Sequence, residues 1–121
     1  MSALVWCGIA VLGGLGAVAR VLVATAVSAR LPRAFPLGTF VVNVSGAFLL
    51  GVLAGVETSG DAYRLAGLAV LGSYTTFSTW MLEARLLQEY GRGRVALAYV
   101  GLSLGVGLGT VALGRLVGSL L

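Results

Sequence analysis

Residues 72–80 read GSYTTFSTW and lie in the middle of an otherwise apolar stretch of the chain. Glycine and β-branched or hydroxyl-bearing residues weaken an α-helix, and their hydroxyl groups can hydrogen-bond backbone groups that a break sets free. Non-helical backbone at membrane depth is tolerated only where protein covers it or where it lines a cavity. We therefore predict an interrupted helix at Gly72–Thr76 and a candidate functional site there. A continuous helix with locally satisfied hydroxyls is the alternative.

The sequence around this stretch is typical of a membrane protein. Hydrophobic residues make up 59% of the 121 residues, charged residues make up 10%, and the mean hydropathy is +1.04, whereas soluble domains carry about 25% charged residues. A helix needs roughly 20 residues to cross a bilayer, and four charge-free stretches approach that length: Ser2–Ala19, Leu37–Val56, Leu65–Leu82 and Val95–Gly114. We predict an all-α integral membrane protein with one domain, residues 1–121, and four spans at about 3–27, 37–56, 63–89 and 95–118.

The charges favour contact with lipid headgroups over binding to a nucleic acid. The net charge of +4 comes from arginine, because the chain has no lysine and no histidine. Most arginines lie in connections or near span ends, and no soluble face carries the basic stripe that nucleic-acid binding needs. The first and third connections carry Arg30, Arg33, Arg92 and Arg94, and the other side carries Arg64 and Arg115. This bias favours cytoplasmic first and third connections but allows insertion in both orientations.

Polar residues inside the apolar stretches are candidate functional groups. Arg20 has apolar neighbours on both sides and either reaches back to the membrane interface or faces a watery vestibule that attracts anions. Thr39 and Asn43 share one helical face, where they either hydrogen-bond another helix or line a polar path. Tyr99 and Ser103 form a similar pair, and Gly107 is next in their row.

Glycines recur at the spacing that lets helices approach closely in lipid. The chain has 19 glycines. Small residues four positions apart occur at Gly51/Gly55, Gly101/Gly105/Gly109 and Gly114/Gly118. We expect these faces to pack against one another or against a partner.

Three blocks of sequence resemble the small fluoride channels of the Fluc or CrcB family, in order and in spacing. They are residues 13–20 (GGLGAVAR), 38–46 (GTFVVNVSG) and 72–80, of which the third is specific. The resemblance covers essentially the whole chain. It implies an antiparallel, dual-topology homodimer in the cell membrane with two fluoride pores. It also implies a structural sodium ion, held on the twofold axis by the backbone carbonyls of Gly72 and Thr75.

The same resemblance assigns roles to individual residues. It places the pore asparagine at Asn43 and the first pore phenylalanine at Phe77, whereas Trp80 stands at the second phenylalanine position. The track on the last span falls on Tyr99, Ser103 and Gly107, where the family commonly has a hydroxyl at the last position, and Arg20 looks like the vestibule arginine. The expected pore residues are Thr39, Asn43, Thr76, Phe77, Ser78, Trp80, Tyr99 and Ser103.

The residue chemistry agrees with this interpretation. The third predicted span has its midpoint at residue 76, so two antiparallel copies can bring their breaks together at the membrane midplane. Fluoride is strongly hydrated, and amide, hydroxyl and ring-edge donors can replace its water without a fixed positive charge. Hydrogen fluoride enters cells as a neutral weak acid and dissociates. A passive channel therefore suffices for export, because the membrane potential drives anions outward.

Two other membrane functions, and an enzyme, fit the sequence less well. A proton-coupled small multidrug transporter needs a carboxylate inside the membrane, whereas the acidic residues Glu57, Asp61, Glu83 and Glu89 fall in a connection or toward the end of the third span. An assembly subunit would explain the glycines but not the hydroxyl-rich stretch with Asn43 and Phe77. Enzymatic activity is not expected, because the chain has no histidine and no nucleophile with a base beside it.

Overall fold

Every regular element that the structure describes is a helix. The computed structural model describes residues 2–31, 35–56 and 60–121. Its elements are α1 (Ala3–Arg30), α2 (Leu37–Gly55), α3 (Gly60–Tyr63), the π-helix η1 (Arg64–Leu71), α4 (Gly72–Tyr74), α5 (Ser78–Glu89) and α6 (Gly93–Ser119). The predicted all-α fold is confirmed for these residues. Arg33, used above to predict the orientation, and Glu57, used above to exclude a transporter, lie outside the described residues.

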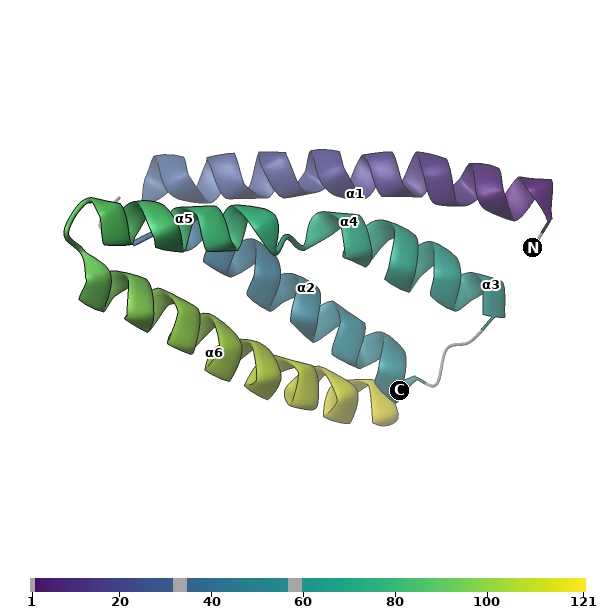
Figure 1. The fold of residues 1–121 in the computed structure, drawn as a ribbon. Coiled ribbons are helices and arrows are strands. Elements are labelled where there is room, and N and C mark those ends of the chain that lie inside the picture. The colour runs from purple at the N-terminus through teal and green to yellow at the C-terminus, as the bar shows by residue number, and fades with distance from the viewer. Residues whose placement is uncertain (1, 32–34, 57–59) are drawn as a thin grey trace.

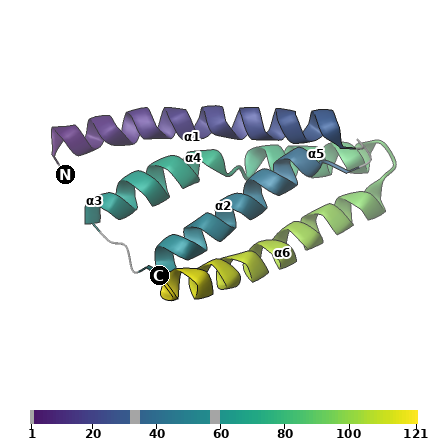
Figure 2. The ribbon, with the colours of Figure 1, turned by 180° about the vertical axis from the view of Figure 1, so that it is seen from behind.

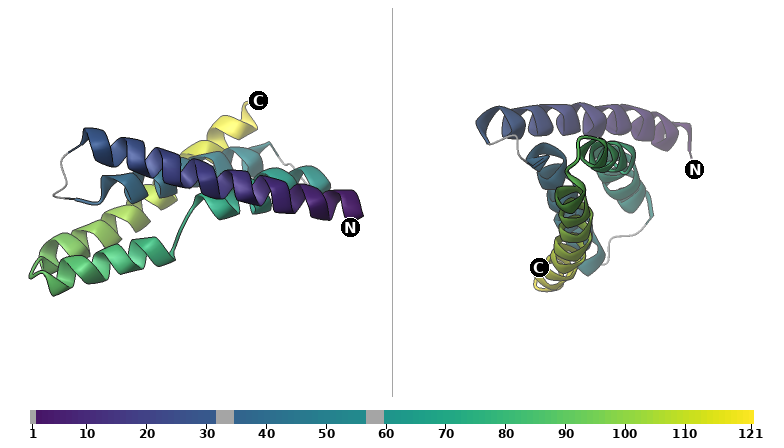
Figure 3. Two further views of the ribbon diagram at one scale, coloured as in Figure 1. Left: turned by 90° about the horizontal axis from the view of Figure 1, so that it is seen from above. Right: turned by 60° about the vertical axis from the view of Figure 1, so that its left-hand side comes forward.

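The chain runs back and forth along an elongated bundle. α1, α2, the segment from α3 to α5, and α6 alternate in direction (Figures 1 and 2). α1 crosses one side of the other helices, as the view from above shows (Figure 3). Within the described ranges three helices, α1, α2 and α6, are long and apolar enough to cross a membrane. The segment from α3 to α5 is divided into shorter pieces, so its role as a fourth span stays a prediction.

Close contact between α2 and α6 depends on glycine. A Cβ at Gly51 or Gly55 would run into the backbone oxygens of Val111 and Arg115 on α6. Conversely, a Cβ at Gly114 or Gly118 would meet the backbone oxygens of Phe48 and Val52 on α2. Small residues let two backbones approach in lipid, where dispersion contacts replace the hydrophobic driving force. The predicted packing of these two glycine pairs is confirmed.

The third glycine series behaves differently. A Cβ at Gly101, Gly105 or Gly109 would meet nothing within 4 Å in the described chain. This stripe of α6 is therefore open in a single copy, and the expectation that it packs against a partner is untested.

The third helical segment is interrupted at residues 75–77, which overlap the C-terminal end of the predicted stretch Gly72–Thr76. The helix continues through Tyr74, whose successor Thr75 is extended (φ −78°, ψ 160°), and α5 begins at Ser78. The predicted break is therefore found at Thr75 and Thr76, whereas residues 72–74 remain helical and Thr75 still donates its N–H to Leu71 O at 3.0 Å. The π-helix η1 before the break was not predicted.

A tight turn sets α5 beside α6. Gly91 has φ +75°, a conformation that favours glycine. Its N–H donates to Gln88 O at 3.1 Å, and Arg92 N–H donates to Leu87 O at 2.8 Å. This is the paired carbonyl capping of a Schellman motif. It ends α5 and brings α6 back antiparallel to it.

Candidate functional site

One side chain holds the interrupted backbone in place. Asn43 on α2 donates from Nδ2 to Thr76 O at 2.9 Å and accepts from Thr76 N–H at Oδ1, at 2.8 Å. The amide thus pairs both backbone groups of one non-helical residue, as a neighbouring strand would. Unpaired backbone groups are costly in lipid, so Asn43 stabilises the break. Of the two roles left open by the sequence, a hydrogen bond to another helix is the one observed, and a pore role stays a prediction.

Hydroxyl groups around the break satisfy other backbone groups. Ser73 Oγ donates to Ala69 O at 2.7 Å, and Thr75 Oγ1 donates to Leu71 O at 3.1 Å. Thr76 Oγ1 accepts from Thr79 N–H at 3.3 Å and so caps the start of α5. The Thr76 hydroxyl therefore serves a freed backbone group, as expected. The hydroxyls of Ser73 and Thr75 instead bond carbonyls of the preceding helix, and Leu71 O already accepts from Thr75 N–H.

Backbone carbonyls remain free on the α4 side of the break. Thr76 N–H donates to Asn43 Oδ1 and Thr79 N–H donates to Thr76 Oγ1. The two N–H groups that would bond Gly72 O and Thr75 O in a continuous α-helix are therefore engaged elsewhere. Carbonyl oxygens are hard ligands that suit a small cation.

Several of the predicted site residues line one cavity. It has a volume of about 400 Å³, and its walls include Asn43, Gly72, Thr75, Thr76, Phe77 and Trp80. None of its lining residues carries a charge. Gly46 of α2 makes room for the break, because a Cβ there would meet Thr75 and Tyr74. The structure therefore brings the second and third blocks of sequence together.

A smaller cavity of about 230 Å³ is also lined by Thr76. Arg20, Thr25, Thr39 and Thr79 line it together with Thr76. Arg20 is partly buried and, within the described chain, has no hydrogen-bond or ion-pair partner. A positive charge beside threonine hydroxyls suits a vestibule that concentrates anions.

The aromatic pair of the third block faces partly outward. The rings of Phe77 and Trp80 meet edge to face, with centroids 5.8 Å apart and an interplanar angle of 78°. Phe77 is 70% exposed, so a single copy does not enclose it. Ser78 is exposed and lines neither cavity. It therefore lies apart from the other predicted residues.

On α6, Tyr99 and Ser103 differ in their hydrogen bonding. Tyr99 is fully buried, packs against Phe35 with ring centroids 5.2 Å apart, and donates its hydroxyl to Glu83 Oε1 at 3.1 Å. Ser103 Oγ and Trp80 Nε1 are buried and have no hydrogen-bond partner among the residues that the structure describes. A side chain added at Gly107 would meet open space.

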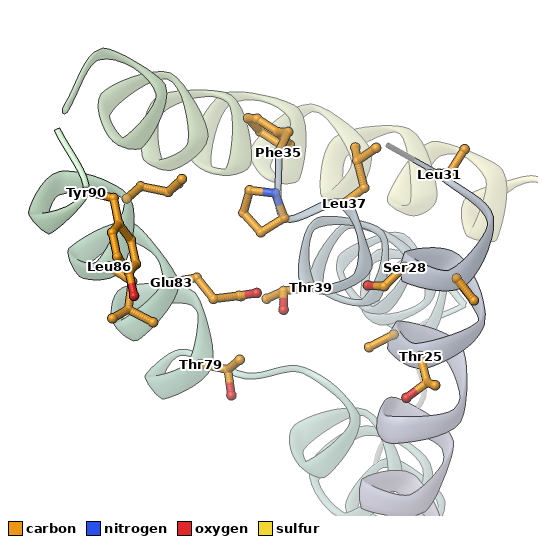
Figure 4. A pocket seen from close by; sticks show the side chains of 14 residues that line it. Thr25, Ser28, Leu31, Phe35, Leu37, Thr39, Thr79, Glu83, Leu86 and Tyr90 are labelled. Atoms are coloured by element: carbon orange, nitrogen blue, oxygen red, sulfur yellow. The ribbon is translucent and has the colours of Figure 1, made fainter. Parts of the chain in front are cut away.

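Glu83 is a candidate residue that sequence reasoning missed. Its side chain points from α5 toward Thr39 in a groove of about 710 Å³, which Thr25, Ser28 and Thr79 also line (Figure 4). The sequence placed Glu83 merely toward a span end. Its hydrogen bond to Tyr99 shows instead that the carboxylate faces the helix packing. The sequence did contain one indication of a role for Glu83: it follows Trp80 by three residues and so lies on the same helical face.

These features define a multi-pass helical membrane protein with an interrupted segment and adjoining uncharged and basic cavities. The sequence profile of the family described as CrcB-like protein, Camphor Resistance (CrcB), matches residues 7–115. The chain belongs to this family.

Named relatives match along nearly their whole length. A protein of Mycolicibacterium paratuberculosis, named fluoride-specific ion channel FluC 2, is 50% identical over 111 residues, which cover 92% of this chain and 91% of the relative. FluC 2 of Mycobacterium bovis is 46% identical over 115 residues, covering 95% and 91%. FluC 2 of Symbiobacterium thermophilum is 47% identical over 113 residues, covering 89% and 92%.

Proposed function

We propose that this chain is a fluoride-selective passive channel that exports fluoride across the cell membrane and relieves fluoride toxicity. The names of the relatives support the substrate and support a function other than an enzyme's. The observation that carries the proposal is the uncharged cavity in which Asn43, Thr76 and Phe77 meet at the interrupted backbone. A break at this depth is tolerated where it lines a cavity.

The cavity offers donors without a fixed positive charge. Asn43 Nδ2 has two hydrogens, and the bond to Thr76 O uses one of them. The second can donate to an anion. The positive edge of the Phe77 ring supplies a further favourable contact. A fixed cation in the narrow part would bind fluoride too firmly for conduction, which requires weak sites; Arg20 in the neighbouring cavity can raise the local anion concentration instead.

The working unit in this proposal is an antiparallel, dual-topology homodimer. Phe77 is 70% exposed in one copy, and Gly101, Gly105 and Gly109 face open space. Exposed faces with aromatic and glycine residues are suited to packing against a second helical bundle. Antiparallel packing would place two breaks about one twofold axis.

A structural sodium ion fits the residues at that axis. The backbone N–H groups that would bond the carbonyls of Gly72 and Thr75 in a continuous helix donate elsewhere, and two copies would supply four such oxygens. The ion would supply a fixed positive charge that holds the two breaks together. The chain's own contribution is to present these oxygens by ending the helix at Tyr74.

Efflux from liposomes tests the proposal. Purified protein should release fluoride rapidly and chloride slowly, and Phe77→Ile should reduce fluoride release strongly. Phe77 is 70% exposed in one copy, so its loss does not empty the core of the bundle. Leu97→Ile, at a 76% exposed site on α6, is the matched control and should leave release unchanged. Equal fluoride release with and without protein would rule the proposal out.

A further inference from the structure

A hydrogen bond between two side chains ties the short helix α4 to α2. The hydroxyl oxygens of Tyr74 and Ser45 lie 3.0 Å apart. Ser45 Oγ donates its hydrogen to Val42 O at 3.1 Å, and a hydroxyl has only one hydrogen, so Tyr74 is the donor and Ser45 the acceptor. Within the part of the chain that the structure describes, no other hydrogen bond joins α4 to a helix outside the segment from α3 to α5.

Close packing reinforces this bond. Gly46 follows Ser45 on α2, and a Cβ at Gly46 would lie 3.2 Å from the Tyr74 ring and would run into Thr75 Cγ2. The end of α4 therefore rests directly on the backbone of α2. Tyr74 is half-buried there, and it is the last helical residue before the extended Thr75. The Tyr74–Ser45 bond thus holds α4 at the point where the helix is interrupted.

Two contacts with α2 set the directions of two backbone carbonyls at the break. In a trans peptide unit the C=O and the N–H point in opposite directions. Thr75 O shares a peptide unit with Thr76 N–H, which donates to Asn43 Oδ1 at 2.8 Å, so Thr75 O points away from the Asn43 amide. Gly72 O belongs to α4, and helix carbonyls point along the axis toward the C-terminal end. Its direction therefore depends on how the axis of α4 is held.

We propose that the Tyr74–Ser45 hydrogen bond positions the Gly72 carbonyl for the structural sodium ion. This inference rests on the sodium site of the proposed function. Asn43 sets the direction of the Thr75 oxygen and Tyr74 that of the Gly72 oxygen, so one turn of α2 holds both ligands of each copy. Oxygens held in place before an ion arrives bind it more tightly, because less freedom is lost on binding. Tyr74 is a positioning residue, since its hydroxyl acts through the backbone of α4.

Sodium binding to the detergent-purified protein tests the proposal. Equilibrium dialysis with radioactive sodium, in which choline chloride keeps the ionic strength constant, measures the sodium concentration at half-saturation. Tyr74→Phe keeps the ring and removes the donor, and should raise this concentration about three- to tenfold, the change that one hydrogen bond produces. Ser45→Ala should raise it equally. The double variant should show no further rise, because each substitution removes the same bond.

Two matched variants and one further measurement separate positioning from general stability. Ser45→Thr keeps the accepting hydroxyl and should bind sodium like the parent protein. Ser73→Ala removes a hydroxyl of α4 that bonds only the carbonyls of Ala69 and Val70, and it should also leave the half-saturating concentration unchanged. A merely structural role of Tyr74 would lower the melting temperature in sodium-free buffer and leave sodium binding as it was.

The outcomes distinguish this inference from the channel proposal. A Tyr74→Phe protein with the half-saturating sodium concentration of the parent would overturn the positioning role, as would additive effects of Tyr74→Phe and Ser45→Ala. A parent protein that releases fluoride from liposomes but binds no sodium would overturn the sodium site and this inference, and would keep the channel. A parent protein that binds sodium with the expected shifts but releases no fluoride would keep this inference and overturn the channel.

Discussion

Asn43 shows how one side chain can hold non-helical backbone inside an apolar segment. Its amide reproduces both hydrogen bonds that Thr76 would make in a regular element. The arrangement fixes Thr76 between the two cavities, because that residue lines both. A structural role and a conducting role are compatible at Asn43, since Nδ2 retains a second hydrogen.

Asn43→Ala should destabilise the protein more than Ser45→Ala. The first change leaves both backbone groups of Thr76 unpaired, which costs about 2–4 kcal/mol. The second removes a hydroxyl that contacts Val42 O and the Tyr74 hydroxyl, which costs about 1 kcal/mol. Unfolding of the detergent-purified variants by heat and by SDS measures the difference. Equal losses would contradict the role of Asn43 as a brace.

At the scale of the elements, the third helical segment was predicted in outline. Glycine, serine and threonine at residues 72–79 indicated the break because they are weak helix formers with hydroxyls that serve free backbone. The π-helix and the exact start of the break were not predicted. Both segments pack against another helix: a Cβ at Gly16 of α1 would run into Val70 O and Ser73 Oγ. Periodicity within one helix does not reveal which group lies opposite it.

The same limit explains which features of the candidate site could be predicted from the sequence. Asn43 and Phe77 were identifiable from residue type and resemblance, and both line the same cavity. The partner of Asn43 and the pairing of Glu83 with Tyr99 required the register between helices. The glycine series also needed the structure, because identical spacings produced a tight interface at Gly51/Gly55 and an open stripe at Gly101/Gly105/Gly109.

Gly51→Ala should separate α2 from α6 and destabilise the bundle by about 1–3 kcal/mol, the usual cost of overpacking. The added methyl would meet the backbone of Val111, which has no flexible end to move aside. Gly93→Ala is the matched control, because its Cβ would meet nothing within 4 Å. Thermal unfolding in detergent compares them. A Gly51→Ala protein as stable as the control would refute the close packing.

At the scale of the whole molecule, a single chain forms a bundle in which many large apolar residues are exposed. Among the described residues, the largest fully buried side chains are those of Tyr99 and Val42. Such a surface suits lipid and a second copy rather than water. The exposed Phe77 and the open glycine stripe belong to this surface. Conduction in our proposal therefore belongs to a pair of chains.

Dual topology predicts equal labelling from both sides of the membrane. Gln88→Cys places a thiol at an exposed site near the end of α5, and Cys7→Ala removes the chain's own cysteine. In intact cells a membrane-impermeant maleimide should reach about half of the thiols, because an antiparallel pair exposes one to each side. Permeabilised cells should give full labelling. Labelling of all or none of the thiols in intact cells would contradict dual topology.

The most direct test of a passive fluoride channel is the reversal potential of the purified protein in a planar bilayer. Opposing gradients of fluoride and chloride should give a current that reverses at the equilibrium potential of fluoride, whatever the chloride gradient or the pH difference. A reversal potential that follows chloride or the proton gradient, or the absence of any current, would contradict the account.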